Sequence, residues 1–399
     1  MMLTVEEQRT TLSLPGRTTP VARDFVEAAG FEGLVDDFTA KLTGHAGVTE
    51  AAAAIRTAGA TLWTTAVDRA QGRLTSGTID PYDDRPLYWA RTSMSRAIRE
   101  WEPSFPLTNL QHRAILRQFD YASRGIDAVS FPDDGAKLLV SGFDTYSLDD
   151  SLRHSNPSGA SALQLDGRTV RTPYGEVTIR TVMLPVNWTD FDQGVVEDAF
   201  GPWLVGPEDP RHRGALDALM TISQTRRGAM HIEKWAGGFR GGTPDNNRAL
   251  NWGPISASAL WPQPQPSPQF IETTLPYDAM IAAGSGPWPV TLNPGITEWP
   301  AGTFPDPDAL RTAPDPSPGA HAASAPGSNY LSNESMYRTN RLRLGSGHPT
   351  MPGGHLHISA LEYPTDASAL TSPEFEADRK AVVDQTVALV EAAGKTVRP

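Results

Sequence analysis

Three residue types that can act together in acyl transfer occur in separate stretches of this chain. Ser332 lies within residues 330–335, His357 ends the stretch 353–357, and Glu233 lies upstream of both. A hydroxyl, an imidazole and a carboxylate can serve as nucleophile, base and orienting group. Such triads are defined by geometry, so their order along a chain neither supports nor excludes them. Residue types alone therefore make these three side chains candidates.

The apolar pattern divides the chain into a helical part and a mixed part. Apolar residues recur at helical spacing between residues 22 and 127, which predicts an all-helical N-terminal domain over residues 1–134. Residues 1–20 are polar and contain two prolines, so we expect them to form a loose arm. From residue 135 to 399, predicted strands alternate with helices, which is typical of a layered α/β domain.

Within the α/β part, apolar runs predict strands at 137–144, 177–186 and 355–361, and Ser372 is expected to cap a last helix. Functional sites of such folds lie beyond the carboxyl ends of strands. Residues 253–328 hold 16 of the 35 prolines, so most of this insertion is expected to be loop or extended chain. A helix is expected only after Pro276.

Composition excludes several classes of protein. The net charge is −12 and the pI about 5.2, which argues against nucleic acid or an anionic membrane as a partner. The chain has no cysteine, which excludes disulfides and cysteine-ligated metals, and it has no apolar run long enough to span a membrane. No signal peptide is visible. We expect a cytoplasmic protein, or a secreted one if a leader has been removed.

Several short motifs occur in the same order as in one known family. They are residues 142–146 (GFDTY), 156–158 (NPS), 184–186 (LPV), 224–227 (QTRR), 233–236 (EKWA), 244–246 (PDN), 274–276 (TLP), 330–333 (YLSN) and 354–359 (GHLHIS). The family has, in this order, G-F-E-P-F, N-P-S, L-P-V, a glutamine with an arginine-containing loop, E-R-x-A, P-D-N, T-L-P, Y-L-C-N and G-F-I-H-V-P. From residue 138 to about 361 the chain thus resembles the pyroglutamyl-peptidase I family of cysteine peptidases.

This resemblance implies a three-layer α/β/α sandwich with a mixed sheet and the removal of an N-terminal pyroglutamyl residue from peptides. It implies a triad at Ser332, His357 and Glu233, with no cofactor and no metal. It also implies a lactam pocket lined by Phe143 and Tyr146, with groups near Gln224 contributing. The compact members of that family lack a counterpart of residues 1–134, and the proline-rich stretch is longer here.

The chain departs from the family most at Ser332, which occupies the position of the nucleophilic cysteine. A thiol ionises near neutral pH, whereas a serine hydroxyl needs a base to remove its proton during attack. We therefore expect weak turnover or none unless the pocket has adapted. An engineered substitution, a natural serine variant and a natural loss of activity all fit. Tyr146 replaces a phenylalanine, which could add a hydrogen bond or narrow the pocket.

Each of these residues also has an ordinary structural interpretation. Ser332 could be a helix N-cap, and Glu233 could face solvent as most glutamates do. Two histidines, His355 and His357, share one face of the predicted strand, and His348 nearby makes a metal site conceivable. Phe143 and Tyr146 could be core aromatics.

The sequence thus predicts an amide hydrolase that works through an acyl-enzyme on a peptide or small cyclic-amide substrate, alone or as an oligomer. Two other functions remain open. One is an inactive relative that binds a lactam or a peptide terminus. The other is a serine amidohydrolase that acts on a different cyclic amide.

Overall fold

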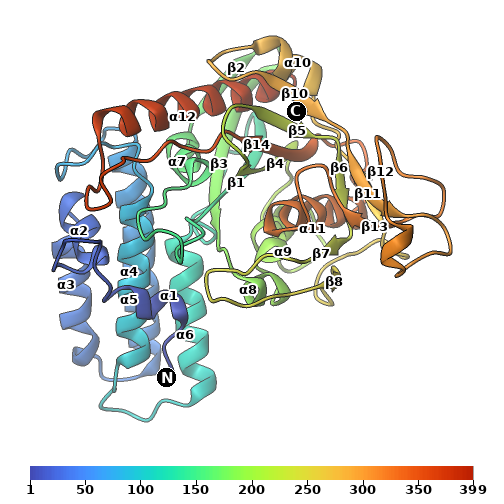
Figure 1. Ribbon diagram of the computed structural model, residues 1–399. Helices are drawn as coiled ribbons and strands as arrows, with labels where there is room; N and C mark the ends of the chain where they lie inside the picture. The colour runs from blue at the N-terminus through green and yellow to red at the C-terminus, as the bar shows by residue number, and fades with distance from the viewer. Residues whose placement is uncertain (399) are drawn as a thin grey trace.

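The computed structural model describes residues 1–398, and its first third is a bundle of helices beside a sheet (Figure 1). The helices are α1 (Val5–Arg9), α2 (Val21–Ala28), α3 (Glu32–Lys41), α4 (Val48–Ala70), α5 (Arg85–Glu100) and α6 (Asn109–Ser123). Trp63, Trp89 and Phe119 are fully or almost fully buried among them, so the expected helical stripes do form a core. Every helix in the described part of the chain is too short or too polar to span a lipid bilayer.

The expectation of a loose arm over residues 1–20 is wrong. Helix α1 begins with a capping box, in which the Thr4 side chain accepts from the Glu7 amide and the Glu7 carboxylate accepts from the Thr4 amide. The Glu7 carboxylate also accepts hydrogen bonds from Ser95 and Arg99 of α5. These partners lie 88 and 92 residues away, so the polar composition of residues 1–20 gave no sign that Glu7 is buried against α5.

The second part of the chain is built on a mixed seven-stranded sheet with the order β10-β5-β14-β4-β1-β3-β2. Its strands are β1 (Ala136–Phe143), β2 (Thr169–Thr172), β3 (Gly175–Leu184), β4 (Ala218–Gln224), β5 (Met230–Glu233), β10 (Val290–Asn293) and β14 (Gly353–Ile358). The strands β3, β1, β4 and β14 run parallel, β5 runs antiparallel to β14, and β2 runs antiparallel to β3. The mixed sheet is confirmed.

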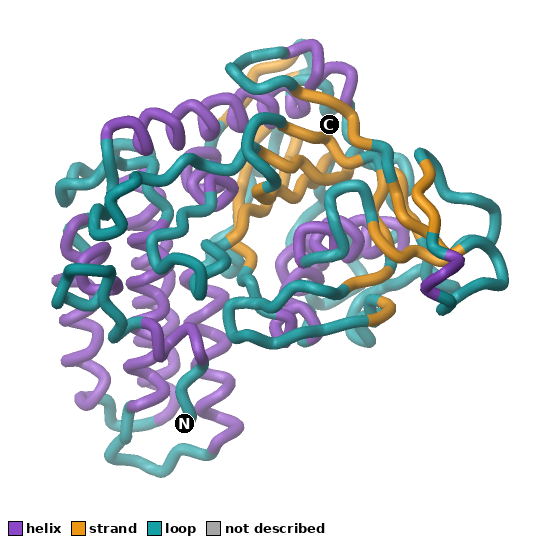
Figure 2. The backbone as a smooth tube through the Cα atoms, in the orientation of Figure 1, coloured by secondary structure: helices purple, strands orange, loops and turns teal. Residues whose placement is uncertain are grey.

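Helices cover both faces of this sheet, as alternation along its strands requires. Leu138 and Val140 of β1 pack on one side with α7 (Pro157–Leu165), α10 (Tyr277–Ala283) and α12 (Pro373–Gly394). Leu139 packs on the other side with α8 (Trp188–Asp192), α9 (Val195–Phe200) and α11 (Leu331–Gly345). The result is the expected three-layer α/β/α arrangement (Figure 2). The predicted cap of α12 is confirmed, because the Ser372 side chain accepts from the Phe375 amide.

The proline-rich region is mostly loop and short strands, as its composition predicts. The strands outside the main sheet are β6 (Trp235–Gly237), β7 (Phe239–Arg240), β8 (Gly253–Pro254), β9 (Phe270–Glu272), β11 (Ile296–Trp299), β12 (Arg311–Ala313) and β13 (His321–Ser324). They form three small sheets, β12-β11-β13, β6-β9 and β7-β8. Strand β10, also from this region, joins the edge of the main sheet beside β5, which the sequence did not indicate.

Helix α11 is buried through its first thirteen residues although it carries many charges. Its Arg338 pairs with Glu334 one turn earlier (2.7 Å) and with Glu197 of α9 (2.8 Å). Arg341 donates to the carbonyl oxygens of Ile255 and Ser256. The helix is therefore held by ion pairs and hydrogen bonds rather than by an apolar stripe.

Candidate active site

The register of two neighbouring strands brings His357 and Glu233 together. On β14, Leu356 and Ile358 face the α12 side of the sheet, so His355 and His357 face the α11 side. Glu233 of β5 is paired in register with His355, which leaves His357 at the diagonal position. Nδ1 of His357 lies 2.6 Å from Oε1 of Glu233, and both side chains are about 3% exposed. A buried imidazole–carboxylate pair of this kind fixes the orientation of the ring.

Two further residues constrain this pair. Asn293, the last residue of β10, donates from Nδ2 to Oε2 of Glu233 (3.0 Å), so the second carboxylate oxygen is also held. Gly327 packs directly against the pair, since a Cβ atom at this position would lie 2.1 Å from Cε1 of His357 and 3.0 Å from Oε1 of Glu233. The close approach of the 327 backbone thus requires glycine.

Ser332 lies in the first turn of α11 and is 8% exposed. Its hydroxyl pairs with the Ser328 hydroxyl (3.2 Å), and the described residues show no hydrogen bond between Ser332 and His357. The N-cap residue is Tyr330, whose side chain makes no capping bond. Within residues 1–398, the amides of Leu331, Ser332 and Asn333 have no hydrogen-bond acceptor. Free amides at a helix N-terminus favour negative charge, which is what an acyl-transfer intermediate develops.

His355 is engaged through both ring nitrogens. Nδ1 lies 2.7 Å from the Thr221 hydroxyl and Nε2 lies 2.8 Å from the Ser223 hydroxyl. Burial, and then the neighbouring His357, lower the pKa of His355 well below its ordinary value. A neutral ring with both nitrogens occupied is poorly suited to act as a base.

A small cavity of about 50 Å³ opens beside Ser332, and its walls include Phe143, Tyr146 and Gln224. Phe143 ends β1 and stacks on Phe191 with ring centroids 6.1 Å apart. Gln224 ends β4 and donates from Nε2 to the Tyr146 hydroxyl (2.6 Å). Its Oε1 atom is buried and has no hydrogen-bond partner in the described part of the chain. The cavity thus offers an aromatic wall and one unpaired acceptor.

Four of the six predicted site residues, Phe143, Tyr146, Gln224 and Ser332, line one cavity. The His357–Glu233 pair lies outside that lining and packs against Gly327, whose neighbour Ser328 bonds to Ser332. The N-cap interpretation of Ser332 is wrong because Tyr330 holds that position, and the solvent-facing interpretation of Glu233 is wrong because its side chain is buried. His348 lies apart, with Nε2 2.9 Å from the carbonyl oxygen of Leu204. No group of three potential metal ligands occurs within residues 1–398.

Sequence reasoning missed Asn293, Gly327 and Ser328. The signal for Asn293 is the short run of β-branched and apolar residues before it, 290–292, which is easily overlooked among prolines. Gly327 and Ser328 lie five and four residues before Ser332 on the 326–330 loop, and only the folded structure shows that this loop covers the histidine.

Comparison with known proteins identifies relatives along most of the chain. Family models described as the PA0049 N-terminal domain and the PA0049 C-terminal domain match residues 1–120 and 137–253. The uncharacterized protein PA0049 of Pseudomonas aeruginosa is 31% identical across 95% of this chain and 85% of its own length. A solved structure, Bacillus amyloliquefaciens pyroglutamyl peptidase I, matches with a TM-score of 0.41 and 16% identity over 66% of this chain and 97% of that chain.

Proposed function

This chain belongs to the PA0049 family, and we propose that it is a pyroglutamyl-peptidase-like hydrolase that removes an N-terminal pyroglutamyl residue from a peptide. One observation carries the proposal. A buried imidazole–carboxylate pair, His357 with Glu233, packs against Gly327. The next residue, Ser328, bonds to Ser332 at a helix N-terminus that borders an aromatic cavity. The motif resemblance of residues 138–361 supplies the substrate class.

In this mechanism, position 332 attacks the carbonyl carbon of the pyroglutamyl residue. His357 takes the hydroxyl proton and later gives it to the departing amine. Glu233 keeps Nδ1 of His357 protonated and stabilises the positive charge that the ring acquires. Asn293 is a positioning residue, because it holds the carboxylate oxygen that faces away from the histidine.

The amides of residues 331–333 are the candidates for stabilising the oxyanion, since they have no other acceptor in the described chain. The acyl-enzyme that forms is then hydrolysed by water, with His357 acting as base. In the cavity, the ring of Phe143 supports stacking of a flat lactam ring, and the unpaired Oε1 of Gln224 supports acceptance of a hydrogen bond from the lactam N–H.

Serine at position 332 sets the expected rate. An oxygen is smaller than a sulfur, and Ser328 rather than His357 is its hydrogen-bond partner here. A misplacement of about 1 Å costs on the order of 100-fold in rate. The chain with Ser332 should therefore be a slow enzyme. A thiol at this position should bring the attacking atom closer to the carbonyl carbon and should ionise near neutral pH.

The test is hydrolysis of a chromogenic pyroglutamyl amide by the natural chain, Ser332→Cys and Ser332→Ala, side by side. We expect Ser332→Cys to hydrolyse the amide at least about tenfold faster than the unsubstituted chain, because a misplaced nucleophile lowers the rate by at least this factor. Ser332→Ala should be inactive and serves as the matched control. Three folded but inactive proteins would remove the peptidase proposal.

The Ser328–Ser332 contact also favours a second function, a binding protein that holds a lactam or peptide terminus without cleaving it. A hydroxyl already paired with another hydroxyl is not activated for attack. Tight binding of a pyroglutamyl peptide, with no hydrolysis by the natural chain or by Ser332→Cys, would support this function.

A further inference from the structure

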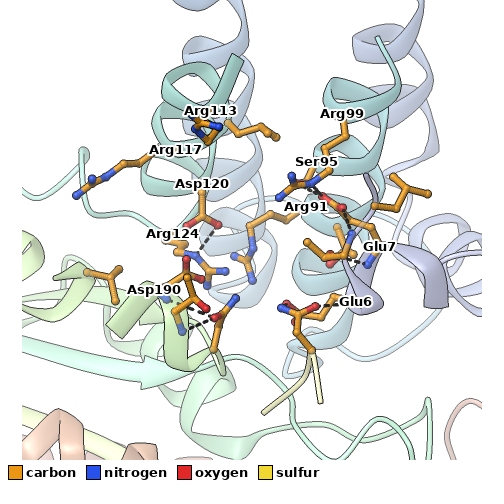
Figure 3. Close-up of a pocket in the computed structure, with 18 of the residues that line it drawn as sticks. Glu6, Glu7, Arg91, Ser95, Arg99, Arg113, Arg117, Asp120, Arg124 and Asp190 are labelled. Atoms are coloured by element: carbon orange, nitrogen blue, oxygen red, sulfur yellow. Dashed lines mark hydrogen bonds and ion pairs between the residues drawn. The ribbon is translucent and has the colours of Figure 1, made fainter. Parts of the chain in front are cut away.

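A second and larger cavity, of about 540 Å³, lies between the helical bundle and the α/β part of the chain. Helices α1, α5 and α6 form one side of it, and the segment of α8 with the following turn forms the other (Figure 3). It shares no lining residue with the cavity at Ser332. The proposed hydrolysis makes no use of it.

The inner end of this cavity carries a carboxylate that has no direct partner in the described chain. Asp190 of α8 has no side-chain hydrogen bond and no ion pair among residues 1–398, although it lies on the cavity wall. By contrast, Arg124 holds Asp120 (2.7 Å), and Tyr88 (2.9 Å) and Asn246 (3.0 Å) hold Glu6. All three carboxylates line the cavity, together with Arg91 and Arg124. Because both of these arginines pair with Asp144, which lies outside the lining, this end still favours a cation that can donate hydrogen bonds.

The electrostatic surroundings of Asp190 agree with this geometry. Burial first, and then the neighbouring carboxylates of Asp120, Glu6 and Asp245, raise the pKa of Asp190 to about 7 against the opposing charge of Arg124. An ammonium group placed here would relieve the repulsion between these carboxylates.

The outer end of the cavity is basic. Arg113 of α6 is exposed and has no side-chain partner in the described chain, and Arg99 of α5 uses only Nε, on Glu7. Helix α5 ends at Glu100 and α6 begins at Asn109, so both arginines lie at the same end of the helix pair. Figure 3 shows them at the opposite end of the cavity from Asp190 and Glu6. Guanidinium groups with free N–H donors match a carboxylate.

The distance between the acidic inner end and the basic outer end of the cavity determines which length of ligand can contact both. Arg113 and Asp120 are seven residues apart on one helix, which corresponds to about 10 Å at 1.5 Å per residue. An extended peptide spans about 3.3–3.6 Å per residue, so three residues cover this distance. A single amino acid is too short to reach both ends, and an inorganic anion would leave Asp190 uncompensated.

We propose that this cavity binds a short peptide of about three residues with a free amino terminus at Asp190 and a free carboxylate at Arg113 and Arg99. Such a peptide is also the kind of product that removal of a pyroglutamyl residue would release. The inference goes beyond the proposed function, however, and stands on the charges of the cavity alone.

The test is isothermal titration calorimetry of the full chain with trialanine, N-acetyl-trialanine, trialanine amide and alanine. We expect trialanine to bind and each of the other three to bind at least about tenfold more weakly, the scale of one lost charge-assisted hydrogen bond. Asp190→Asn should remove the preference for the free amine. Arg113→Gln, at an exposed position, should remove the preference for the free carboxylate.

Asp134→Asn is the matched control, because Asp134 is exposed and lies outside the cavity. It should bind trialanine as the natural chain does. Equal binding of trialanine and its acetylated form, or no binding at millimolar concentration, would overturn the proposal. If Asp190→Asn does not fold, Arg113→Gln with the four ligands still decides the outcome.

Discussion

Gly327→Ala is the substitution that most directly examines how the loop at residues 326–330 supports the site. The new Cβ atom would lie 2.1 Å from Cε1 and 2.5 Å from Nδ1 of His357, whereas ordinary contacts start at 3.4 Å. The loop or the imidazole must therefore move by more than 1 Å. Overpacking of this size costs about 1–3 kcal/mol of stability, and a 1 Å displacement at a reacting group costs about 100-fold in rate.

The assay is kcat/KM for a pyroglutamyl amide in the Ser332→Cys background, which gives the larger signal, together with thermal unfolding. We expect Gly327→Ala to reduce kcat/KM by about 100-fold while the protein stays folded at 25 °C. Gly295→Ala is the control, since nothing lies within 4 Å of its new Cβ atom. If Gly327→Ala retains full kcat/KM, the argument that this backbone positions His357 is refuted.

Three further outcomes follow from single contacts. Asn293→Ala removes the hydrogen bond to one oxygen of Glu233, so kcat should fall about tenfold with KM unchanged. Asn293→Gln should restore part of the lost kcat. A change confined to KM would contradict this reasoning. Tyr146→Phe removes the hydroxyl that accepts a hydrogen bond from the Gln224 amide. KM should rise by about fivefold, which corresponds to a loss of roughly 1 kcal/mol in binding free energy. An unchanged KM would show that this hydrogen bond does not shape the cavity. For Asp190, a folded pKa of about 7 against an ordinary 3.8 means that the folded chain keeps a proton that the unfolded chain loses as pH rises from about 4 to 7. The free energy of unfolding therefore falls across that pH window. In urea unfolding, Asp190→Asn should be more stable than the unsubstituted chain by about 1–2 kcal/mol at pH 8 and equally stable near pH 4. No difference in stability at pH 8 would contradict this.

Much of the architecture could be predicted because buried helices and strands show a periodic pattern of apolar residues in the sequence. The runs at β1, β3 and β14 are continuously apolar or alternating, and the cap at Ser372 marks the start of α12. Phe143 and Gln224 line one cavity because they end the neighbouring parallel strands β1 and β4, and Ser332 reaches the same cavity from the start of α11.

The rest could not be predicted because its partners are distant in sequence. Helix α1 is anchored by α5, whose residues lie 88 and 92 positions later. Strand β10 has only four residues and depends on pairing with β5. Helix α11 has no apolar stripe, so its polar sequence resembles a surface segment although it is buried.

The buried charges of α11 bear on how this protein opens. Arg338 pairs with Glu197 of α9 only when α11 is docked, whereas its pair with Glu334 lies within the helix. Separating one partner from a buried ion pair costs about 3–5 kcal/mol. A partly undocked α11 would thus leave unpaired charges in an apolar interior. The hydrogen-bonded amides of α11, from Glu334 onward, should consequently exchange with solvent only through unfolding of the whole α/β part, which gives position 332 a rigid support.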